Sequence, residues 1–168
     1  DTHLFVAAAG NSGLDIDSSP QYPAAYNATN ILSVAAHNSS GSLAGFSNYG
    51  STAVDISAPG VSIRSTWPGS GYRSKNGTSM AAPHAAGVAA LLLGADPGLS
   101  PSEMIDILLQ AGRPDAALEV VRSGSALDAE KALQLTGDGP TVTLSGQPAE
   151  TTVMIGAQLS LTAAATAS

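Results

Sequence analysis

Residues 79–95 are mostly small or aliphatic and include no charged side chain. A helix that is apolar on every side has to be buried inside a domain, so this segment predicts a central helix. Pro83 lies near its start, and we place it in the first turn, where no main-chain donor is required. The longest uninterrupted apolar run, residues 85–95, is shorter than the ~20 residues of a membrane span. We therefore expect a globular domain and no transmembrane span.

Two short apolar segments provide strands on which this helix can pack. Residues 4–9 and 31–36 are continuously apolar and bounded by Asn, Gly or Ser, which is typical of strands buried on both faces of a parallel sheet. The segment between them is rich in turn formers and predicts a surface loop. Shorter β-prone pieces follow at residues 53–57, 61–66 and 72–74. Together these patterns predict an α/β domain with a mostly parallel sheet.

Further elements follow the central helix. Ser100, Pro101 and Glu103 form an N-cap, a first-turn proline and a capping-box glutamate, and they predict a helix that Gly112 ends. A short helix is expected over residues 127–135. Residues 137–140 have the composition of a linker, so we assign residues 1–136 to one domain. Polar and apolar residues alternate in residues 141–168, which we interpret as the start of an Ig-like β-sandwich domain that is cut short.

The charges are unevenly distributed along the chain. Thirteen acidic and six basic residues give a net charge of −7, which argues against a nucleic-acid partner, because phosphate binding needs clustered Lys and Arg. Eight of the thirteen acids fall within residues 96–138, whereas residues 56–95 carry only Arg64, Arg73 and Lys75. The absence of cysteine excludes disulfides, thiol catalysis and cysteine-ligated zinc. The negative net charge therefore arises outside the segment that leads into and forms the central helix.

Ser79 stands at the start of that helix, after Gly77 and Thr78. Its side chain would lie at the open end of the helix, where main-chain N–H groups favour a developing negative charge. That geometry suits a nucleophile, although a lone serine before a helix is more often an N-cap. The neighbouring residues favour the nucleophile. Residues 77–84, Gly-Thr-Ser-Met-Ala-Ala-Pro-His, closely resemble the serine motif of the subtilisin-like serine proteases (subtilases, peptidase family S8).

Four other segments resemble the same family and occur in the family's order. They are residues 7–13 with the oxyanion-hole asparagine, residues 21–24 of the substrate pocket, and the markers at 46–50 and 55–60. The resemblance covers residues 4–135 and implies the C-terminal part of a three-layer subtilisin-like catalytic domain. It implies a serine endopeptidase that forms an acyl-enzyme on Ser79, with Asn11 and the Ser79 N–H binding the oxyanion. An esterase of the α/β-hydrolase type is disfavoured because the Gly-x-Ser-x-Gly elbow is absent.

The resemblance also implies which residues contact a peptide or protein substrate. A pocket lined by small residues leaves room for a sizeable apolar side chain before the cut bond. Thr78 is expected to assist the oxyanion hole, and Met80 stands beside the nucleophile. The residues implied in substrate binding are Ala8, Ala9, Gly10, Gln21, Thr78 and Met80.

The catalytic Asp and His of the family precede the asparagine and serine segments, and neither of their motifs occurs in this chain. His84 is five residues after Ser79 on one helix, about 140° around it, so its ring cannot meet the serine hydroxyl. His3 leads into a strand, and His37 has no partner that the sequence identifies. We expect a chain that is inactive alone and whose partner is the missing N-terminal part of the same domain. The alternative is a non-catalytic relative that serves as a binding module.

The resemblance implies no required cofactor and a secreted, extracellular protein. Calcium is a candidate structural ion, because Ala24, Tyr26 and Asp55 fall near a weak cation site of some family members. Calcium prefers six to eight oxygen ligands, and these residues supply only one carboxylate, so we assign no metal-binding residues.

Overall fold

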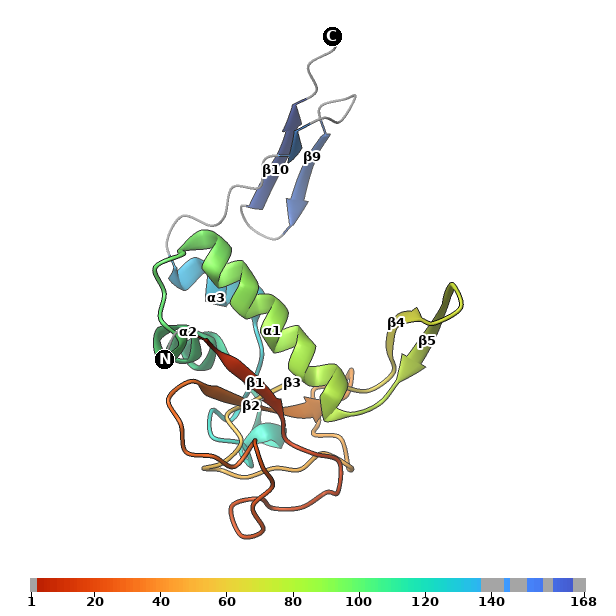
Figure 1. The fold of residues 1–168 in the computed structure, drawn as a ribbon, viewed down its shortest axis with the longest axis vertical. Coiled ribbons are helices and arrows are strands. Elements are labelled where there is room, and N and C mark those ends of the chain that lie inside the picture. Colours follow the sequence, from red (N-terminus) through yellow and green to blue (C-terminus); the bar gives the residue numbers. More distant parts are fainter. Residues whose placement is uncertain (1–2, 137–143, 146–150, 156–158, 165–168) are drawn as a thin grey trace.

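A five-stranded sheet forms the centre of the structure, a computed structural model that describes residues 3–136 and three strands beyond them (Figure 1). The strands lie in the order β1-β2-β3-β7-β6, and all neighbours are parallel except β6 and β7. The predicted α/β fold with a mostly parallel sheet is confirmed, and the sheet is mixed because of β6. The strands are β1 (Phe5–Ala8), β2 (Ile31–His37), β3 (Ile56–Pro59), β6 (Arg113–Pro114) and β7 (Ser125–Ala126).

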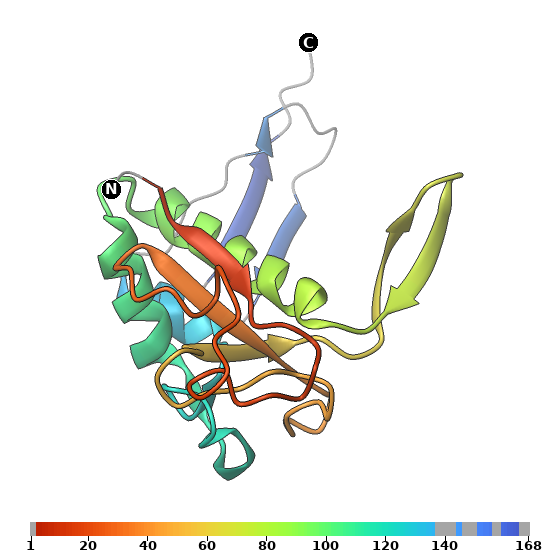
Figure 2. The same ribbon diagram turned by 60° about the horizontal axis from the view of Figure 1, so that its bottom comes forward.

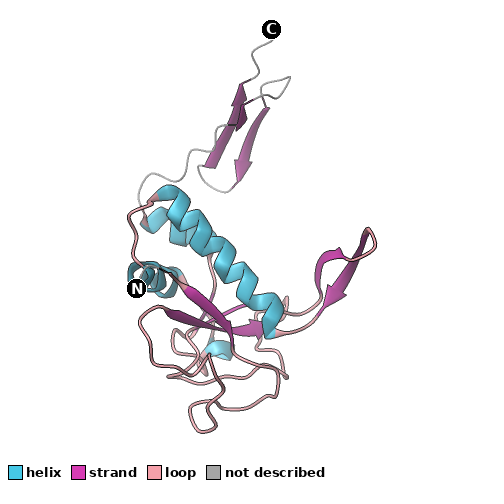
Figure 3. Cartoon of the chain, in the orientation of Figure 1, coloured by secondary structure: helices cyan, strands magenta, loops and turns pink. Residues whose placement is uncertain are grey.

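The two faces of this sheet are covered differently. Helices α1 (Thr78–Ala95), α2 (Pro101–Ala111) and α3 (Ala129–Leu135) share a core with Leu32, Val34 and Ile56 on one face (Figure 2). The other face packs on loops and the short 3₁₀ helix η1 (Ala116–Leu118), as Figure 3 shows. In the described residues the expected third layer therefore consists of loops and one helical turn. Both faces of β2 are buried, as its continuous apolar sequence predicts.

Helix α1 is buried along one side only, so the prediction of complete burial is wrong. Ala81, Ala85 and Leu92 are inaccessible against the sheet, whereas Leu91 and Leu93 are 42% and 40% exposed. The sheet can cover only the side of the helix that faces it, and Leu91 and Leu93, on either side of the buried Leu92, lie outside that contact. Pro83 lies in the second turn and not the first, where it leaves the Ser79 carbonyl without its usual helical donor.

By length and composition, α1 is the one helix among the described residues that could cross a membrane. Its contacts with β1, β2 and β3 are those of a helix in a folded domain, because they hold one face of it against the sheet.

Local sequence signals position the other helices well. Ser100 Oγ accepts a hydrogen bond from the Glu103 N–H at 3.3 Å, and a Glu103 carboxylate oxygen accepts one from the Ser100 N–H at 2.8 Å. The capping box predicted for α2 is thus confirmed, with Pro101 as its first residue. Helix α3 begins at Ala129, two residues later than expected, because Asp128 caps it by accepting from the Lys131 N–H at 3.0 Å.

Two strands form a hairpin that projects beside the start of α1 (Figure 1). Strand β4 (Ile63–Trp67) pairs with β5 (Gly71–Lys75) in antiparallel register, and Ile63 stands opposite Lys75 at the base. Gly69 in the connecting loop has φ +88°, a conformation that side chains other than glycine disfavour.

The C-terminal strands form a separate three-stranded sheet in the order β8-β10-β9. They are β8 (Leu144–Ser145), β9 (Thr151–Ile155) and β10 (Leu159–Ala164), so strands are present where alternation predicted them. A sandwich needs two packed sheets, and the described residues contain one here, so the Ig-like domain stays a prediction. The linker expected at residues 137–140 lies outside the described residues.

Candidate active site

Ser79 is the second residue of α1, and its side chain is exposed. Gly77 precedes the helix with φ +152° and donates its N–H to the Gly60 carbonyl at 2.8 Å. A Cβ at Gly60 would overlap Ala36 and come within 2.9 Å of the Gly77 carbonyl. Glycine at position 60 therefore lets the serine loop lie directly on the ends of β2 and β3. In the first turn of α1, the Thr78 N–H donates to Asn11 Oδ1 at 2.8 Å and the Met80 N–H donates to the Gly77 carbonyl at 3.0 Å. The Ser79 N–H, at the second helical position, has no intrahelical acceptor.

Asn11 lies just beyond the end of β1 and is held by Thr78. Its Oδ1 accepts hydrogen bonds from the Thr78 main-chain N–H at 2.8 Å and from the Thr78 hydroxyl at 3.0 Å. The Thr78 hydroxyl oxygen in turn accepts from the Gly10 N–H at 3.1 Å. These bonds fix the carbonyl oxygen of the Asn11 amide, which leaves the amide NH₂ as its free donor. The amide donor and Ser79 are thus brought to the same loop junction.

Asn48 holds the other side of the Asn11 loop, and sequence reasoning assigned it no role. Its amide NH₂ donates to the Ala9 carbonyl at 2.9 Å, and its Oδ1 accepts from the N–H groups of Ser12 and Leu14 at 3.0 and 3.1 Å. The side chain is 1% exposed. Its only sequence signal is its place in the segment at 46–50, which resembles a family marker. Asn48 shapes the loop that presents Asn11.

The residues implied in substrate binding differ in accessibility. Ala8, Gly10 and Met80 are half-buried and Gln21 is exposed, whereas Ala9 is 1% exposed and Thr78 is inaccessible. Gln21 lies in the loop between β1 and β2, where its carbonyl accepts from the Ala25 N–H at 2.8 Å. An added Cβ at Gly77 would lie 3.6 Å from the Asn11 amide and 3.7 Å from the Met80 sulfur. Asn11, Thr78, Ser79 and Met80 therefore form one cluster.

A hollow of about 320 Å³ opens beside Ser79. It separates the first turns of α1 from the base of the β4–β5 hairpin and is lined by Ile63, Arg64, Ser65, Ser79, Met80, Pro83 and His84.

The buried and helical histidines are both engaged away from Ser79. His84 Nδ1 donates to the Met80 carbonyl at 2.8 Å, and His37 Nδ1 lies 3.0 Å from Ser57 Oγ. Burial is the largest cause that lowers the pKa of His37, with smaller contributions from Arg113 and His84 and an opposing one from Asp115. Within residues 3–136, the Ser79 hydroxyl makes no hydrogen bond. Asp1 and Thr2 lie outside the described residues.

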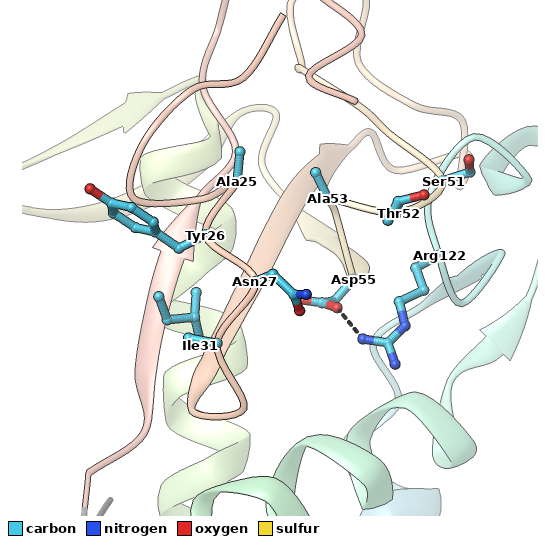
Figure 4. Close-up of a pocket in the computed structure, with 10 residues that line it drawn as sticks. Ala25, Tyr26, Asn27, Ile31, Ser51, Thr52, Ala53, Asp55 and Arg122 are labelled. Atoms are coloured by element: carbon cyan, nitrogen blue, oxygen red, sulfur yellow. Dashed lines mark hydrogen bonds and ion pairs between the residues drawn. The ribbon is translucent and has the colours of Figure 1, made fainter. Parts of the chain in front are cut away.

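A larger hollow, of about 440 Å³, surrounds Asp55 on the other side of the sheet (Figure 4). One carboxylate oxygen of Asp55 accepts from the Ser33 N–H at 2.8 Å, and the other accepts from Arg122 Nη1 at 3.1 Å. Burial raises the pKa of Asp55, while the bonds from Ser33 and Arg122 oppose that shift.

These residues do not fit a calcium ion. Both oxygens of the only carboxylate in this hollow already have donors, and the Arg122 guanidinium supplies the positive charge beside it. Among the described residues no group of three or more His, Cys, Asp and Glu side chains could hold a metal. The expectation of calcium near Ala24, Tyr26 and Asp55 therefore finds no support in the donor set.

Comparison with known proteins gives consistent similarities. Residues 2–139 match the sequence model of the subtilase family, peptidase S8. Over 97 residues, 58% of this chain and 34% of the relative, the chain is 52% identical to subtilisin BL of Lederbergia lenta. The self-cleaved protease domain of PatA superposes with a TM-score of 0.66 and 36% identity, over 82% of this chain and 51% of that domain. A protease of Pseudoalteromonas arctica superposes with a TM-score of 0.69 and 31% identity, over 81% of this chain and 43% of that protease. The chain spans about a third to half of these proteins.

Proposed function

Because the chain belongs to the subtilase family, we propose that it carries the nucleophile and the oxyanion hole of a serine endopeptidase. The observation that carries this proposal is the pair of hydrogen bonds from Thr78 to Asn11 Oδ1. They turn the free NH₂ of Asn11 outward beside the start of α1, where the Ser79 N–H is also unpaired. Two donors beside one exposed hydroxyl are what the oxygen of a tetrahedral intermediate requires.

In this mechanism, Ser79 Oγ attacks the carbonyl carbon of the scissile peptide bond, and its proton passes to a histidine base. The carbonyl oxygen takes up negative charge and accepts hydrogen bonds from Asn11 Nδ2 and the Ser79 N–H. Collapse of the intermediate expels the amine, which receives the proton from the imidazolium, and leaves an acyl-enzyme on Ser79. Water then hydrolyses the acyl-enzyme through the same groups.

We propose that the histidine and its orienting aspartate belong to another part of the same catalytic domain. Two features support this: the exposed leucines of α1, and β1, which has a strand on only one side in the sheet order. The greater length of the similar proteases leaves room for such a part. Its docking would cover the apolar side of α1 and bring the base to Ser79.

The accessible residues near Asn11 suit a pocket for the substrate side chain before the cut bond. Ala8, Gly10 and Gln21 would line it, with the buried Ala9 setting its depth. Thr78 would act by positioning Asn11, because its hydroxyl hydrogen is given to Asn11 Oδ1. Met80 would flank the nucleophile, so its oxidation would add bulk and polarity at the site. The reaction needs no cofactor, and we infer an extracellular location from the resemblance alone.

The test is active-site labelling with a fluorophosphonate, which reacts with activated serines. In the full-length protein we expect stoichiometric labelling and peptide hydrolysis, both abolished by Ser79→Ala. The matched control is Ser102→Ala, an exposed serine in the first turn of α2. The 168-residue chain alone should show no acylation burst with an activated ester.

Two outcomes would contradict the proposal. A full-length protein that folds but is neither labelled nor hydrolytic would favour the non-catalytic binding module. A stoichiometric burst from the 168-residue chain, abolished by Ser79→Ala, would show that the base is not supplied from elsewhere.

A further inference from the structure

The β4–β5 hairpin concentrates positive charge in an otherwise acidic chain. It carries Arg64, Arg73 and Lys75, half of the six basic residues, and no acidic residue. The ion pair found among the described residues joins Arg122 to Asp55, so none of the hairpin cations is neutralised by a carboxylate there. All three side chains are exposed. The hairpin is therefore a local positive surface on a molecule with a net charge of −7.

Aromatic rings hold these cations in place. Arg73 Cζ and Lys75 Nζ lie 4.9 and 4.7 Å from the centre of the Trp67 ring, and Arg64 Cζ lies 5.5 Å from that of Tyr72. A cation over a ring is attracted by the quadrupole of the ring but keeps its full charge. Such contacts orient the side chains and leave them able to bind an anion.

Two of the cations stand at the base of the hairpin, next to the nucleophile. Lys75 pairs with Ile63, the first residue of β4, and Arg64 is the following residue. Arg64 and Ile63 line the hollow that Ser79, Met80 and His84 also line. A substrate residue that enters this hollow therefore meets Arg64 directly. Lys75 stands opposite Ile63 and projects from the other face of the hairpin, so it adds to the positive field near the hollow without lining it.

The start of α1, where Ser79 is the second residue, lies between the hairpin and the chain that follows β1. In Figures 1 and 2 the chain after β1 lies on one side of the start of α1, and β4 and β5 lie on the other. If the pocket before the cut bond is formed by Ala8, Gly10 and Gln21, the opposite side receives the residues after the cut bond. This assignment rests on the proposed function.

We propose that Arg64, with Lys75 adding to the local positive field, selects peptide substrates with acidic side chains in the first positions after the scissile bond. An Asp or Glu carboxylate there would pair with Arg64, which has no carboxylate partner among the described residues. The site is exposed and the attraction is screened by salt, so the selectivity is moderate and depends on ionic strength. We expect a kcat/KM about fivefold higher for Glu than for Gln at these positions.

The experiment uses the full-length protein and peptides with Glu or Gln at each of the first three positions on either side of one cut bond. The test variant is Arg64→Gln combined with Lys75→Gln, neither of which forms the acyl-enzyme or the oxyanion hole. The matched control is Arg113→Gln with Lys131→Gln, which removes the same charge from exposed positions on β6 and α3. We expect the Glu preference after the cut bond to fall to within about twofold in the test variant and to persist in the control. In the wild-type protein it should shrink in 0.5 M salt, a readout that does not depend on how the variant folds.

Equal kcat/KM for Glu and Gln peptides in the wild-type protein would overturn the inference while leaving the protease function intact. A preference confined to positions before the cut bond, or one that survives in the test variant, would overturn it as well. Failure of Ser79-dependent hydrolysis with every peptide would overturn both the inference and the proposed function.

Discussion

At the scale of single residues, the site depends on side chains that bind main-chain groups of distant loops. Asn11 and Ser79 could be singled out as candidates because each belongs to a contiguous motif. The orientation of the Asn11 amide and the role of Asn48 could not, because their partners are 34 or more positions away in the sequence. Hydrogen bonds over such separations depend on how the strands and loops are arranged in three dimensions, and the local sequence does not specify that arrangement.

Asn48 gives the sharpest prediction at this scale. Asn48→Ala removes three hydrogen bonds by which a buried side chain holds the loop that carries Asn11, and it leaves the Ala9 carbonyl unpaired. We expect a loss of about 3 kcal/mol in the free energy of unfolding, measured by urea denaturation, together with a lower kcat in the full-length protein. The control is Asn38→Ala, which also removes three hydrogen bonds, but from an exposed turn. An equal loss in the two variants would contradict the role given to Asn48.

At the scale of elements, helix ends were predicted better than helix environments. The box at Ser100 and Glu103 involves residues three apart, so sequence alone locates the start of α2. The burial of α1 depends on what packs against each of its sides, and its uniform apolar composition does not record that. Pro83 lies in the second turn because it is the sixth residue of α1, which begins at Thr78, one residue earlier than predicted.

His37 ties three strands together and predicts a pH dependence. It ends β2 and bonds to Ser57 on β3, whose hydroxyl donates to the Ser125 carbonyl on β7 at 3.2 Å. Burial lowers the pKa of His37 in the folded state, so between that value and the unfolded value near 6.5 the unfolded chain binds more protons. The contribution of neutral His37 to the free energy of unfolding is therefore fully present above about pH 6.5. It is lost as the pH falls through the pKa of His37 in the folded state.

The measurement is the free energy of unfolding of the wild-type protein and of His37→Gln between pH 7.5 and 5. Gln keeps a donor for Ser57 but does not titrate. We expect the wild-type protein to lose more stability on acidification than the variant does. Asp55, whose pKa is raised, contributes in the opposite direction, but it is present in both proteins and cancels in the comparison. Parallel pH profiles would contradict this role of His37.

At the scale of the whole molecule, the α/β class and the parallel sheet were predictable because buried strands have continuous apolar sequences. The mixed character of the sheet was not, since β6 and β7 are two residues long and leave no periodicity to detect. The packing of loops on the second face also escaped prediction, because turn-rich sequence marks a loop without indicating what it covers.

The exposed side of α1 leads to a prediction for the 168-residue chain studied on its own. Leu91 and Leu93 give it an apolar surface, so we expect it to bind the dye ANS and to self-associate in analytical ultracentrifugation. Leu91→Gln with Leu93→Gln should reduce both effects. Val120→Gln, at a residue of similar exposure away from α1, should not. A monomeric wild-type chain without dye binding would show that α1 needs no further covering.

The Thr78 bonds to Asn11 join residues 67 positions apart, so the proposed oxyanion donor and the proposed nucleophile meet only after β1 and α1 have docked. Contacts between distant residues and parallel strand pairings form slowly compared with helices and turns. A newly made molecule is therefore expected to form its helices well before the proposed site is assembled. Any activity that depends on this site would then appear only after the domain has folded.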